Sequence, residues 1–260
     1  MDARRTIWVA VIFATNACTM PVAPAVPYNE GSIGKVNGGF LLGGQELQAK
    51  KHVHWYKSND RHWGISRFVQ ALDRAAVAVN TRYAGPPLLI GDLSARYGGR
   101  IGGHASHRSG RDIDILYFVT SPSGAPVESP GFFRFERDGL ATTPRGFVRF
   151  DVERNWSFVR VMLLDPDARV QWIFMSNVLR MHLLLYAFAK GEPTDLLVRA
   201  ATVLHEPRPP ALPHDDHMHV RTECNYEEIS SGCQPTGPWR EWFGDPPSPP
   251  SSERADWEIE

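Results

Sequence analysis

Apolar residues recur at helical spacing in two stretches of the chain, residues 65–78 and 176–190. Ser176 begins the second stretch and Gly191 follows it, as is typical of the two ends of a helix. A third helix is predicted at 193–203. Short apolar or alternating runs between turn-forming residues predict strands at 87–92, 112–119, 170–174 and 217–221. Because helices and strands are mixed along the chain, the pattern predicts an α+β fold.

The first residues have the layout of an export signal. The apolar run 6–17 follows Arg4 and Arg5 and ends in small side chains before Cys18. A helix that spans a bilayer needs about 20 apolar residues, so no transmembrane span is predicted. We expect residues 1–18 to direct the chain to the periplasm or out of the cell, with Cys18 as a candidate lipid anchor. A buried first strand or helix is the alternative interpretation.

Composition predicts a single domain with two flanking segments. Residues 19–30 are rich in proline and predict an extended tether, whereas residues 244–260 combine proline, serine and acidic residues and predict a disordered tail. No repeat, linker or shift in composition interrupts residues 31–243, which are expected to form the domain. Within it, the segment 121–146, rich in Gly, Pro and Ser, predicts a surface excursion beside the functional site.

The charge balance limits the classes of partner. The 28 Lys and Arg residues offset 29 Asp and Glu residues, and the formal net charge is -1 at pH 7. Proteins that bind nucleic acid or anionic lipid through electrostatic attraction carry a clustered positive excess. No nucleic acid partner is therefore predicted.

Two cysteines remain outside the predicted export signal. Cys224 and Cys233 lie nine positions apart in a segment that contains Gly and Ser. An oxidising compartment would allow them to pair, so we expect one disulfide there. Two free thiols in a cytosolic protein are the alternative.

Histidines and aspartates concentrate in two segments, residues 104–114 and 214–219. His217 and His219 are two positions apart, so on a strand both side chains point to the same face. Asp114 alternates with apolar residues and is expected on the side of its strand opposite the core. His107 precedes it in a loop whose Gly110 allows the chain to turn back.

Two imidazoles and one carboxylate form a typical catalytic zinc site, in which the fourth position is left for water. Zinc lowers the pKa of water to about 7, and a further imidazole can then transfer protons. Asp215 and Asp216 either orient the imidazoles or form the turn before the strand. The isolated histidines are expected to be structural, and they are His52, His54, His62, His182 and His205.

The same residues carry a family resemblance. His107, followed seven positions later by Asp114 and far downstream by His217-x-His219, is similar to the metal signature of lysostaphin-type peptidases, D-Ala-D-Ala peptidases and the hedgehog domain. The chain more closely resembles the penicillin-insensitive murein endopeptidase family, and the likeness covers nearly all of residues 31–243. The segments that carry it are residues 31–34, 37–38, 56–64, 91–94, 99–107, 150–151, 154–156, 170–174 and 214–221.

The resemblance implies a fold of the hedgehog and D-Ala-D-Ala peptidase type, with a central antiparallel sheet flanked by helices and long loops. It implies one zinc ion held by His107, Asp114 and His219. His217 matches the catalytic histidine of the family, and His214 matches a further active-site histidine. A histidine also occurs in the family at His104, but its role is open. The chain departs from the family in its cysteines, since the best-known members have several disulfides.

The function implied is a zinc-dependent murein endopeptidase that hydrolyses D-alanyl–meso-diaminopimelyl cross-links of peptidoglycan, whose cross-link peptides are the expected partner. A D-alanyl-D-alanine carboxypeptidase and a non-catalytic zinc-bearing peptidoglycan-binding module are the alternatives. Ser32 and Lys35 fit the Ser-x-x-Lys pattern of penicillin-binding serine enzymes, but the chain contains no Lys-Thr-Gly, so a serine mechanism is not expected.

Overall fold

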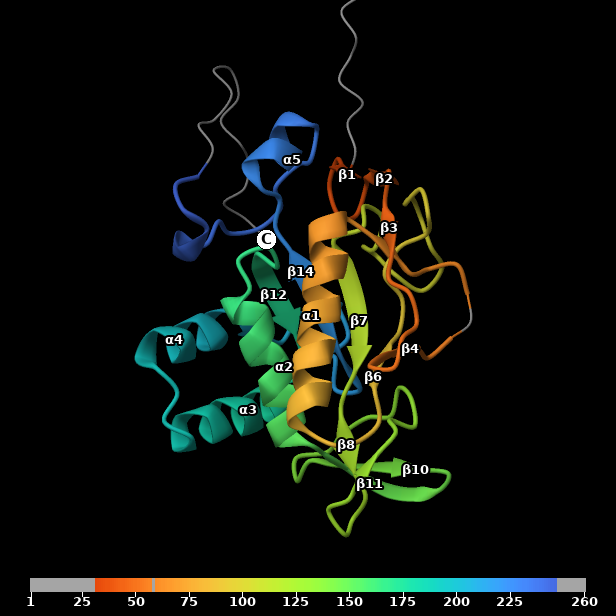
Figure 1. Cartoon of the computed structure of the whole chain (residues 1–260), viewed down its shortest axis with the longest axis vertical. Coiled ribbons are helices and arrows are strands. Elements are labelled where there is room, and N and C mark those ends of the chain that lie inside the picture. The colour runs from red at the N-terminus through yellow and green to blue at the C-terminus, as the bar shows by residue number, and fades with distance from the viewer. Residues whose placement is uncertain (1–30, 58, 247–260) are drawn as a thin grey trace, which may run out of the picture.

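A six-stranded sheet forms the centre of the structure, a computed structural model that describes residues 31–57 and 59–246 (Figure 1). Each of the four middle strands is antiparallel to the next. In order across the sheet they are β12 (Val170–Phe174), β14 (His217–Thr222), β7 (Asp112–Leu116) and β6 (Leu88–Ile90). The edge strands, β13 (Leu204–His205) and β4 (Val53–Trp55), pair in parallel with β12 and β6. The predicted α+β fold is confirmed, and the antiparallel centre of the sheet has parallel edges.

The predicted export signal and tether, residues 1–18 and 19–30, lie outside the described residues, as do residues 247–260 of the predicted tail. Within the described part of the chain, no helix combines the length and the apolar character needed to cross a bilayer.

Helices cover one face of the sheet. Figure 1 shows α1 (Ser66–Arg82) and α2 (Val152–Leu164) side by side in front of it, with α3 (Asn177–Ala189) and α4 (Thr194–Val203) beyond α2. Helix α1 continues past its predicted end, while α3 and α4 match the predicted ranges to within a residue. The hydroxyl of Ser176 caps α3 by accepting a hydrogen bond from the backbone N–H of Leu179.

The hydrophobic pattern does not predict α2, because this helix is buried on most sides. Residues 154–159 are all buried, so the helix lacks the alternation of polar and apolar faces that reveals a period of 3.6 residues. Three of these residues are polar, and the two larger ones have partners inside the protein. The Arg154 guanidinium donates to the carbonyl of Val119, and the Asn155 amide donates to that of Phe118.

The segment predicted as a surface excursion contains regular structure. A second sheet has the order β10-β11-β8-β9, and its strands are β8 (Val119–Thr120), β9 (Pro126–Val127), β10 (Leu140–Thr143) and β11 (Gly146–Phe150). The excursion therefore is not one irregular loop, because most of its Gly and Pro residues lie between short strands. Phe132, in the loop between β9 and β10, packs edge-on against His217, so the segment lies beside that histidine.

The remaining elements are short and frame the end of the sheet where β14 finishes. They are β1 (Gly31–Ile33), β2 (Phe40–Leu42), β3 (Gln45–Glu46), β5 (Trp63–Gly64), α5 (Tyr226–Ser230) and a 3-10 turn at Glu241–Phe243. Ser32 lies on β1 and is buried, whereas a Ser-x-x-Lys nucleophile would stand at the start of a helix.

Strand β7 is buried on both of its faces. Ile113 and Ile115 enter the hydrophobic core as the alternation predicts. Asp112 and Asp114 point to the other face, but they are buried too, whereas alternation of polar and apolar residues is typical of a strand with one face in solvent. Histidines from the loop before β7 and from the neighbouring strand β14 lie against these side chains, and the carboxylates are therefore held among imidazoles and not in water.

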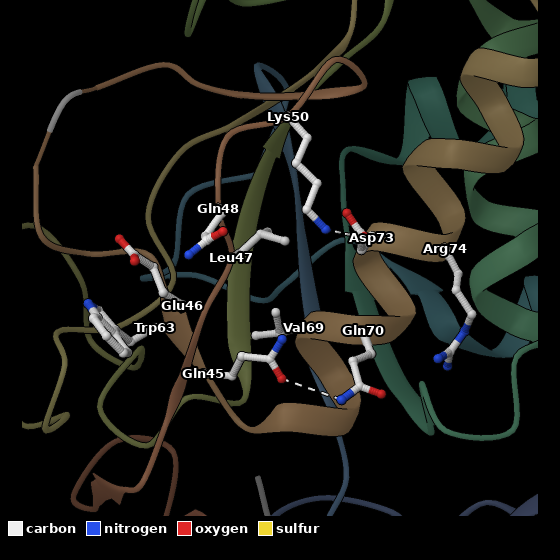
Figure 2. A pocket seen from close by; sticks show the side chains of 10 residues that line it. All are labelled: Gln45, Glu46, Leu47, Gln48, Lys50, Trp63, Val69, Gln70, Asp73 and Arg74. Carbon is white, nitrogen blue, oxygen red and sulfur yellow. Dashed lines mark hydrogen bonds and ion pairs between the residues drawn. The ribbon is translucent and has the colours of Figure 1, made fainter.

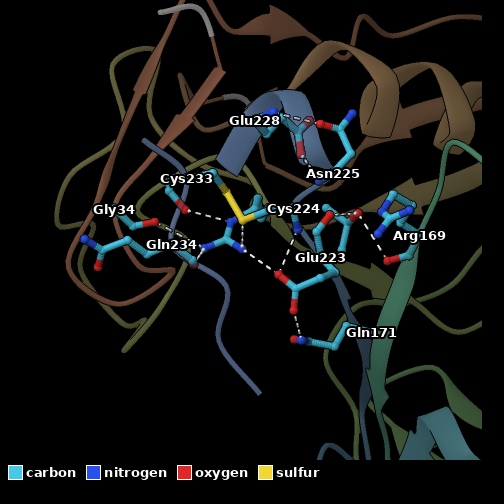
Figure 3. Close-up of a disulfide and its surroundings, with 12 residues drawn as sticks. Gly34, Arg169, Gln171, Glu223, Cys224, Asn225, Glu228, Cys233 and Gln234 are labelled. Atoms are coloured by element: carbon cyan, nitrogen blue, oxygen red, sulfur yellow. Dashed lines mark hydrogen bonds and ion pairs between the residues drawn. A yellow bond between two sulfur atoms is a disulfide. The ribbon is translucent and has the colours of Figure 1, made fainter. Parts of the chain in front are cut away.

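The expected disulfide is present between Cys224 and Cys233, just after β14 (Figure 3). Both cysteines are buried, and the bond ties the end of β14 to the segment after α5. The backbone N–H of Gln234 donates to the carbonyl of Gly34, which links this corner to the strand β1 region.

Replacing both cysteines by alanine should lower the free energy of unfolding by about 2–3 kcal/mol, because the short closed loop restricts the unfolded chain. Urea denaturation of both proteins, with and without a reducing agent, measures the difference. The reducing agent should destabilise the unaltered protein and leave the double variant unchanged. Equal midpoints for the two oxidised proteins would contradict the prediction.

Candidate metal centre

The antiparallel pairing of β14 with β7 brings the two predicted polar strands together. His219 lies directly opposite Asp114 in the register, and His217 lies opposite Leu116. Side chains two apart on a strand share a face, so both histidines project to the side that carries Asp114. His107 arrives from the loop before β7, where its φ of 63° turns the backbone back toward the strand.

The three predicted ligands form a nearly equilateral triangle of donor atoms. His107 Nε2 is 3.3 Å from Asp114 Oδ1 and 3.3 Å from His219 Nδ1, and His219 Nδ1 is 3.2 Å from Asp114 Oδ1. A tetrahedral zinc ion with bonds of about 2.0–2.1 Å places neighbouring donors about 3.3 Å apart. The donor set and its spacing therefore fit a zinc ion bound at one face of this triangle.

Asp114 Oδ1 supports the same interpretation. The atom is buried and has no hydrogen-bond partner within the described residues, although three imidazole nitrogens surround it at 3.2–3.4 Å. Charge-assisted hydrogen bonds between nitrogen and a carboxylate are shorter, about 2.7–2.9 Å. A buried carboxylate oxygen without a hydrogen-bond partner, with imidazole nitrogens converging on it, is the arrangement expected around a cation.

The charges at the site favour a cation as well. Burial tends to raise the pKa of Asp114, but the His107 imidazole and the other histidines outweigh it and hold that pKa well below its usual range. Burial likewise tends to lower the pKa of His107, and the Asp114 carboxylate reverses the direction. Asp114 is thus ionised at neutral pH and supplies the negative charge of the site.

Hydrogen bonds on the far side of each ring fix which nitrogen faces the triangle. His107 donates from Nδ1 to the carbonyl of Leu93 at 2.6 Å, which leaves Nε2 free as a ligand. His219 donates from Nε2 to Asp112 Oδ1 at 2.8 Å, which leaves Nδ1 free. Asp112 also accepts from Arg221 Nε at 2.6 Å, so its charge is balanced although it is fully buried. Asp112 was not predicted as a site residue, and its period-two spacing from Asp114 is the signal that identifies it.

Asp112→Asn should weaken zinc binding about 10- to 100-fold, because the carboxylate raises the basicity of His219 and holds its ring in place. Competition with a chelator of known affinity measures the change in the dissociation constant. Asp167→Asn, at an exposed aspartate that pairs with Arg74, is the matched control and should bind zinc as the unaltered protein does. Equal affinity of the Asp112 and Asp167 variants would disprove this role.

The predicted catalytic histidine lies beside the triangle but is held differently. His217 Nε2 is 3.4 Å from Asp114 Oδ1, and its Nδ1 donates to Asp216 Oδ1 at 2.6 Å. Burial alone would lower the pKa of His217, but Asp114 and Asp216 together raise it to about 9. Of the two roles left open for the neighbouring aspartates, Asp216 orients an imidazole, whereas Asp215 pairs with Arg134 at 2.8 Å.

His214 completes the group of rings. Its centroid lies 4.8 Å from that of His217 and 5.5 Å from that of His219. Burial, together with the charges of His219 and His217, lowers its pKa to about 4, so the ring is neutral at pH 7. Its φ of 54° is unusual for a residue with a side chain, and its Nδ1 donates to the carbonyl of Leu212. The Nε2 atom therefore carries a lone pair.

His104, whose role the sequence left open, also faces Asp114. Its Nδ1 is 3.5 Å from Asp114 Oδ2, and one donor atom each from His104, His107 and Asp114 lie within 4.8 Å of one another. These three residues are a second set that can hold a metal ion. The Nε2 atom of His104 bonds to Asp92, which also accepts from Asn59 and Arg61. Asn59, Arg61 and Asp92 were not predicted as site residues, although each lies in a segment that carries the family resemblance.

Three of the histidines expected to be structural have partners outside the candidate metal centre. His62 stacks on Trp55, His52 bonds to Asp73, and His205 packs beside Trp172.

Comparison with known proteins identifies the family of the chain. The family model described as penicillin-insensitive murein endopeptidase matches residues 32–244. The protein named "Penicillin-insensitive murein endopeptidase" of Escherichia coli O17:K52:H18 (strain UMN026 / ExPEC) is 28% identical over 242 residues, which cover 88% of this chain and 81% of that protein. The protein of the same name from Escherichia coli O157:H7 (strain EC4115 / EHEC) is 28% identical over 239 residues, with the same coverage. Since the family model spans most of the chain, the chain belongs to the penicillin-insensitive murein endopeptidase family.

Proposed function

We propose that the chain is a zinc-dependent murein endopeptidase that hydrolyses D-alanyl–meso-diaminopimelyl cross-links of peptidoglycan. The observation that carries the proposal is the triangle of His107, Asp114 and His219, whose donor atoms have the spacing of three ligands of one tetrahedral zinc ion. Family membership supports the substrate class, because the related proteins are named as murein endopeptidases.

His107, Asp114 and His219 would hold the ion. Zinc in such a site supplies a Lewis acid, which polarises a carbonyl group and lowers the pKa of water to about 7. With zinc bound to Asp114, that carboxylate would no longer hold the proton of His217 as strongly. The ring would then be able to accept a proton from the attacking water at Nε2 and pass it to the departing amine, while Asp216 holds the ring from the other side. His214 is neutral and presents the Nε2 lone pair, which suits it to orienting that water as an acceptor.

A location outside the cytoplasm follows from the substrate and is supported by the disulfide, which persists in oxidising compartments. The export signal and the lipid anchor at Cys18 stay predictions from the sequence. The pair of His217 and Asp216 favours an enzyme over a zinc-bearing binding module, since a module that only binds has no use for an oriented proton acceptor.

One assay tests the proposal. Zinc-loaded protein is incubated with cross-linked muropeptide dimers, with and without a chelator, and the products are identified by mass. We expect two monomers, no effect of penicillin, and no product with the chelator. Release of a terminal D-alanine in place of monomers would identify a carboxypeptidase, and binding of the dimers without any product would identify a binding module.

The affinity for zinc should fall as the pH decreases from 8 to 6. A proton and the metal compete for Nε2 of His107. Burial tends to lower the pKa of that ring, but the Asp114 carboxylate outweighs it and raises the pKa, so the competition begins at a higher pH than for a free imidazole. Zinc titrations at several pH values, with a competitor calibrated at each pH, measure the effect. An affinity that is the same at pH 5 and pH 8 would show that these imidazoles do not bind the metal.

A further inference from the structure

Two grooves adjoin one another beside α1, outside the metal centre. The first, about 620 Å³, runs between the segment that follows β3 and the first turns of α1, and the second has a volume of about 600 Å³. Glu46 and Trp63 line both. Figure 2 shows Trp63 and Glu46 at one end of the first groove, with Asp73 and Arg74 at the other end. We call the two together the Trp63 groove.

Most charges in the first groove are already paired within the protein. Lys50 bonds to Asp73 at 2.8 Å, and Arg74 bonds to Asp165 at 2.7 Å. The other polar groups are mainly neutral amides, those of Gln45, Gln48 and Gln70, with the carboxylate of Glu46. Gln70 donates from Nε2 to Gln45 Oε1 at 3.4 Å, so in this pair the opposite amide atoms, Gln45 Nε2 and Gln70 Oε1, are the ones that can face a ligand. Each amide offers both donors and an acceptor. The lining therefore suits a ligand that is rich in hydrogen-bonding groups and poor in charge.

The second groove contributes aromatic rings. Tyr97 is 69% exposed, so its ring is accessible to a ligand. The guanidinium of Arg96 lies 5.1 Å from the centre of the Trp63 ring and 5.6 Å from that of Tyr97. Trp and Tyr have an apolar ring and a polar group, so they can bind a ligand that is apolar on one face and polar at its edges.

Hydrogen bonds connect this groove to the metal centre. Asn59 lines the second groove and donates to Asp92, and Asp92 bonds to His104. The backbone of Trp63 pairs with Ser94, which follows Leu93, the residue whose carbonyl holds His107. Residues that line the second groove are therefore bonded to residues that contact the candidate zinc site.

We propose that the Trp63 groove binds the glycan strand of peptidoglycan, a chain of N-acetylated sugars, next to the peptide that is cut. The inference rests on the proposed function. Sugar rings have an apolar face that can stack on Trp63 and Tyr97, and their hydroxyl and acetamido groups match the glutamine amides. A stem peptide, which carries free carboxylates and an ammonium group, would meet charges that are already paired with one another.

Calorimetric titration of the zinc-loaded protein with chitohexaose, a peptide-free β-1,4-linked N-acetylglucosamine hexamer, tests the binding site directly. Tyr97→Ala and Gln70→Ala should each weaken binding about three- to tenfold, as expected for the loss of one aromatic or hydrogen-bonding contact. Both side chains are exposed, so neither change should disturb folding. Phe147→Ala, at an exposed ring on β11, is the matched control and should bind as the unaltered protein does. No binding by the unaltered protein, or equal weakening by the control, would overturn the inference.

A second comparison separates this inference from the proposed function. The rates of the unaltered protein and of Tyr97→Ala are measured on intact sacculi and on glycan-free cross-linked peptide dimers. The ratio of the sacculus rate to the dimer rate should fall about tenfold in the variant. An unchanged ratio would overturn the glycan site even if the dimers are cleaved. Failure of the unaltered protein to cleave either substrate would overturn the proposed function, whereas the chitohexaose titration would still decide the binding site.

Discussion

His217→Ala should keep one zinc ion and lose turnover by a factor of about 10²–10⁴, the usual contribution of a positioned acid–base group. The ring lies beside the triangle of proposed ligands, and its Nδ1 is engaged by Asp216 at 2.6 Å. The alanine variant removes the proton acceptor and leaves His107, Asp114 and His219 unchanged. The zinc content should therefore stay unchanged while the rate falls. Both would fall if His217 were a ligand.

Zinc content by elemental analysis and the rate on cross-linked muropeptide dimers are the two measurements. His54→Ala, at an exposed histidine on β4, is the matched control and should change neither quantity. A near-normal rate for His217→Ala would show that the catalytic assignment is wrong. Loss of zinc together with activity would place His217 in the ligand set.

His219→Ala should abolish zinc retention and, with it, activity. The substitution removes one of three donors and leaves the buried carboxylate of Asp112 without its imidazole partner. A ligand that binds only the folded state raises its stability. Zinc should therefore raise the melting temperature of the unaltered protein and have little effect on the variant, a difference that does not depend on any assay of activity.

The same experiment decides between the two candidate ligand sets. His104, His107 and Asp114 also offer donor atoms close to one another, so His104→Ala is the informative partner variant. We expect His104→Ala to keep the thermal shift with zinc and His219→Ala to lose it. The opposite result would assign His104, in place of His219, to the metal.

Local patterns predicted most of the elements that build the fold. The four middle strands and three of the longer helices lie close to their predicted ranges, because each has a periodic apolar face that packs against the core. Helix α2 was missed, since its buried Arg154 and Asn155 remove that periodicity. The strands in 121–146 were missed because they are short and separated by turn residues. In both cases tertiary contacts, and not local preference, stabilise the element.

Local patterns also predicted part of the candidate site. His217 and His219 share a face because a strand repeats every two residues, and the family resemblance supplied the distant His107. Asp92 and Asp112 were not assigned, because an aspartate has the same appearance in a sequence whether it is exposed or holds an imidazole. The structure shows that each is buried and bonded to a histidine, His104 for Asp92 and His219 for Asp112.

The sequence by itself determined the chemical types of the site residues, their local spacing and the cysteines that pair. These properties are local, since they depend on the chain's covalent order and on the repeat of a strand. Tertiary structure alone decided that His107 and His219, which are 112 positions apart, bring their nitrogens to within 3.3 Å of each other. That distance depends on the register between β7 and β14 and on the turn at His107, and both are fixed by how the whole sheet packs.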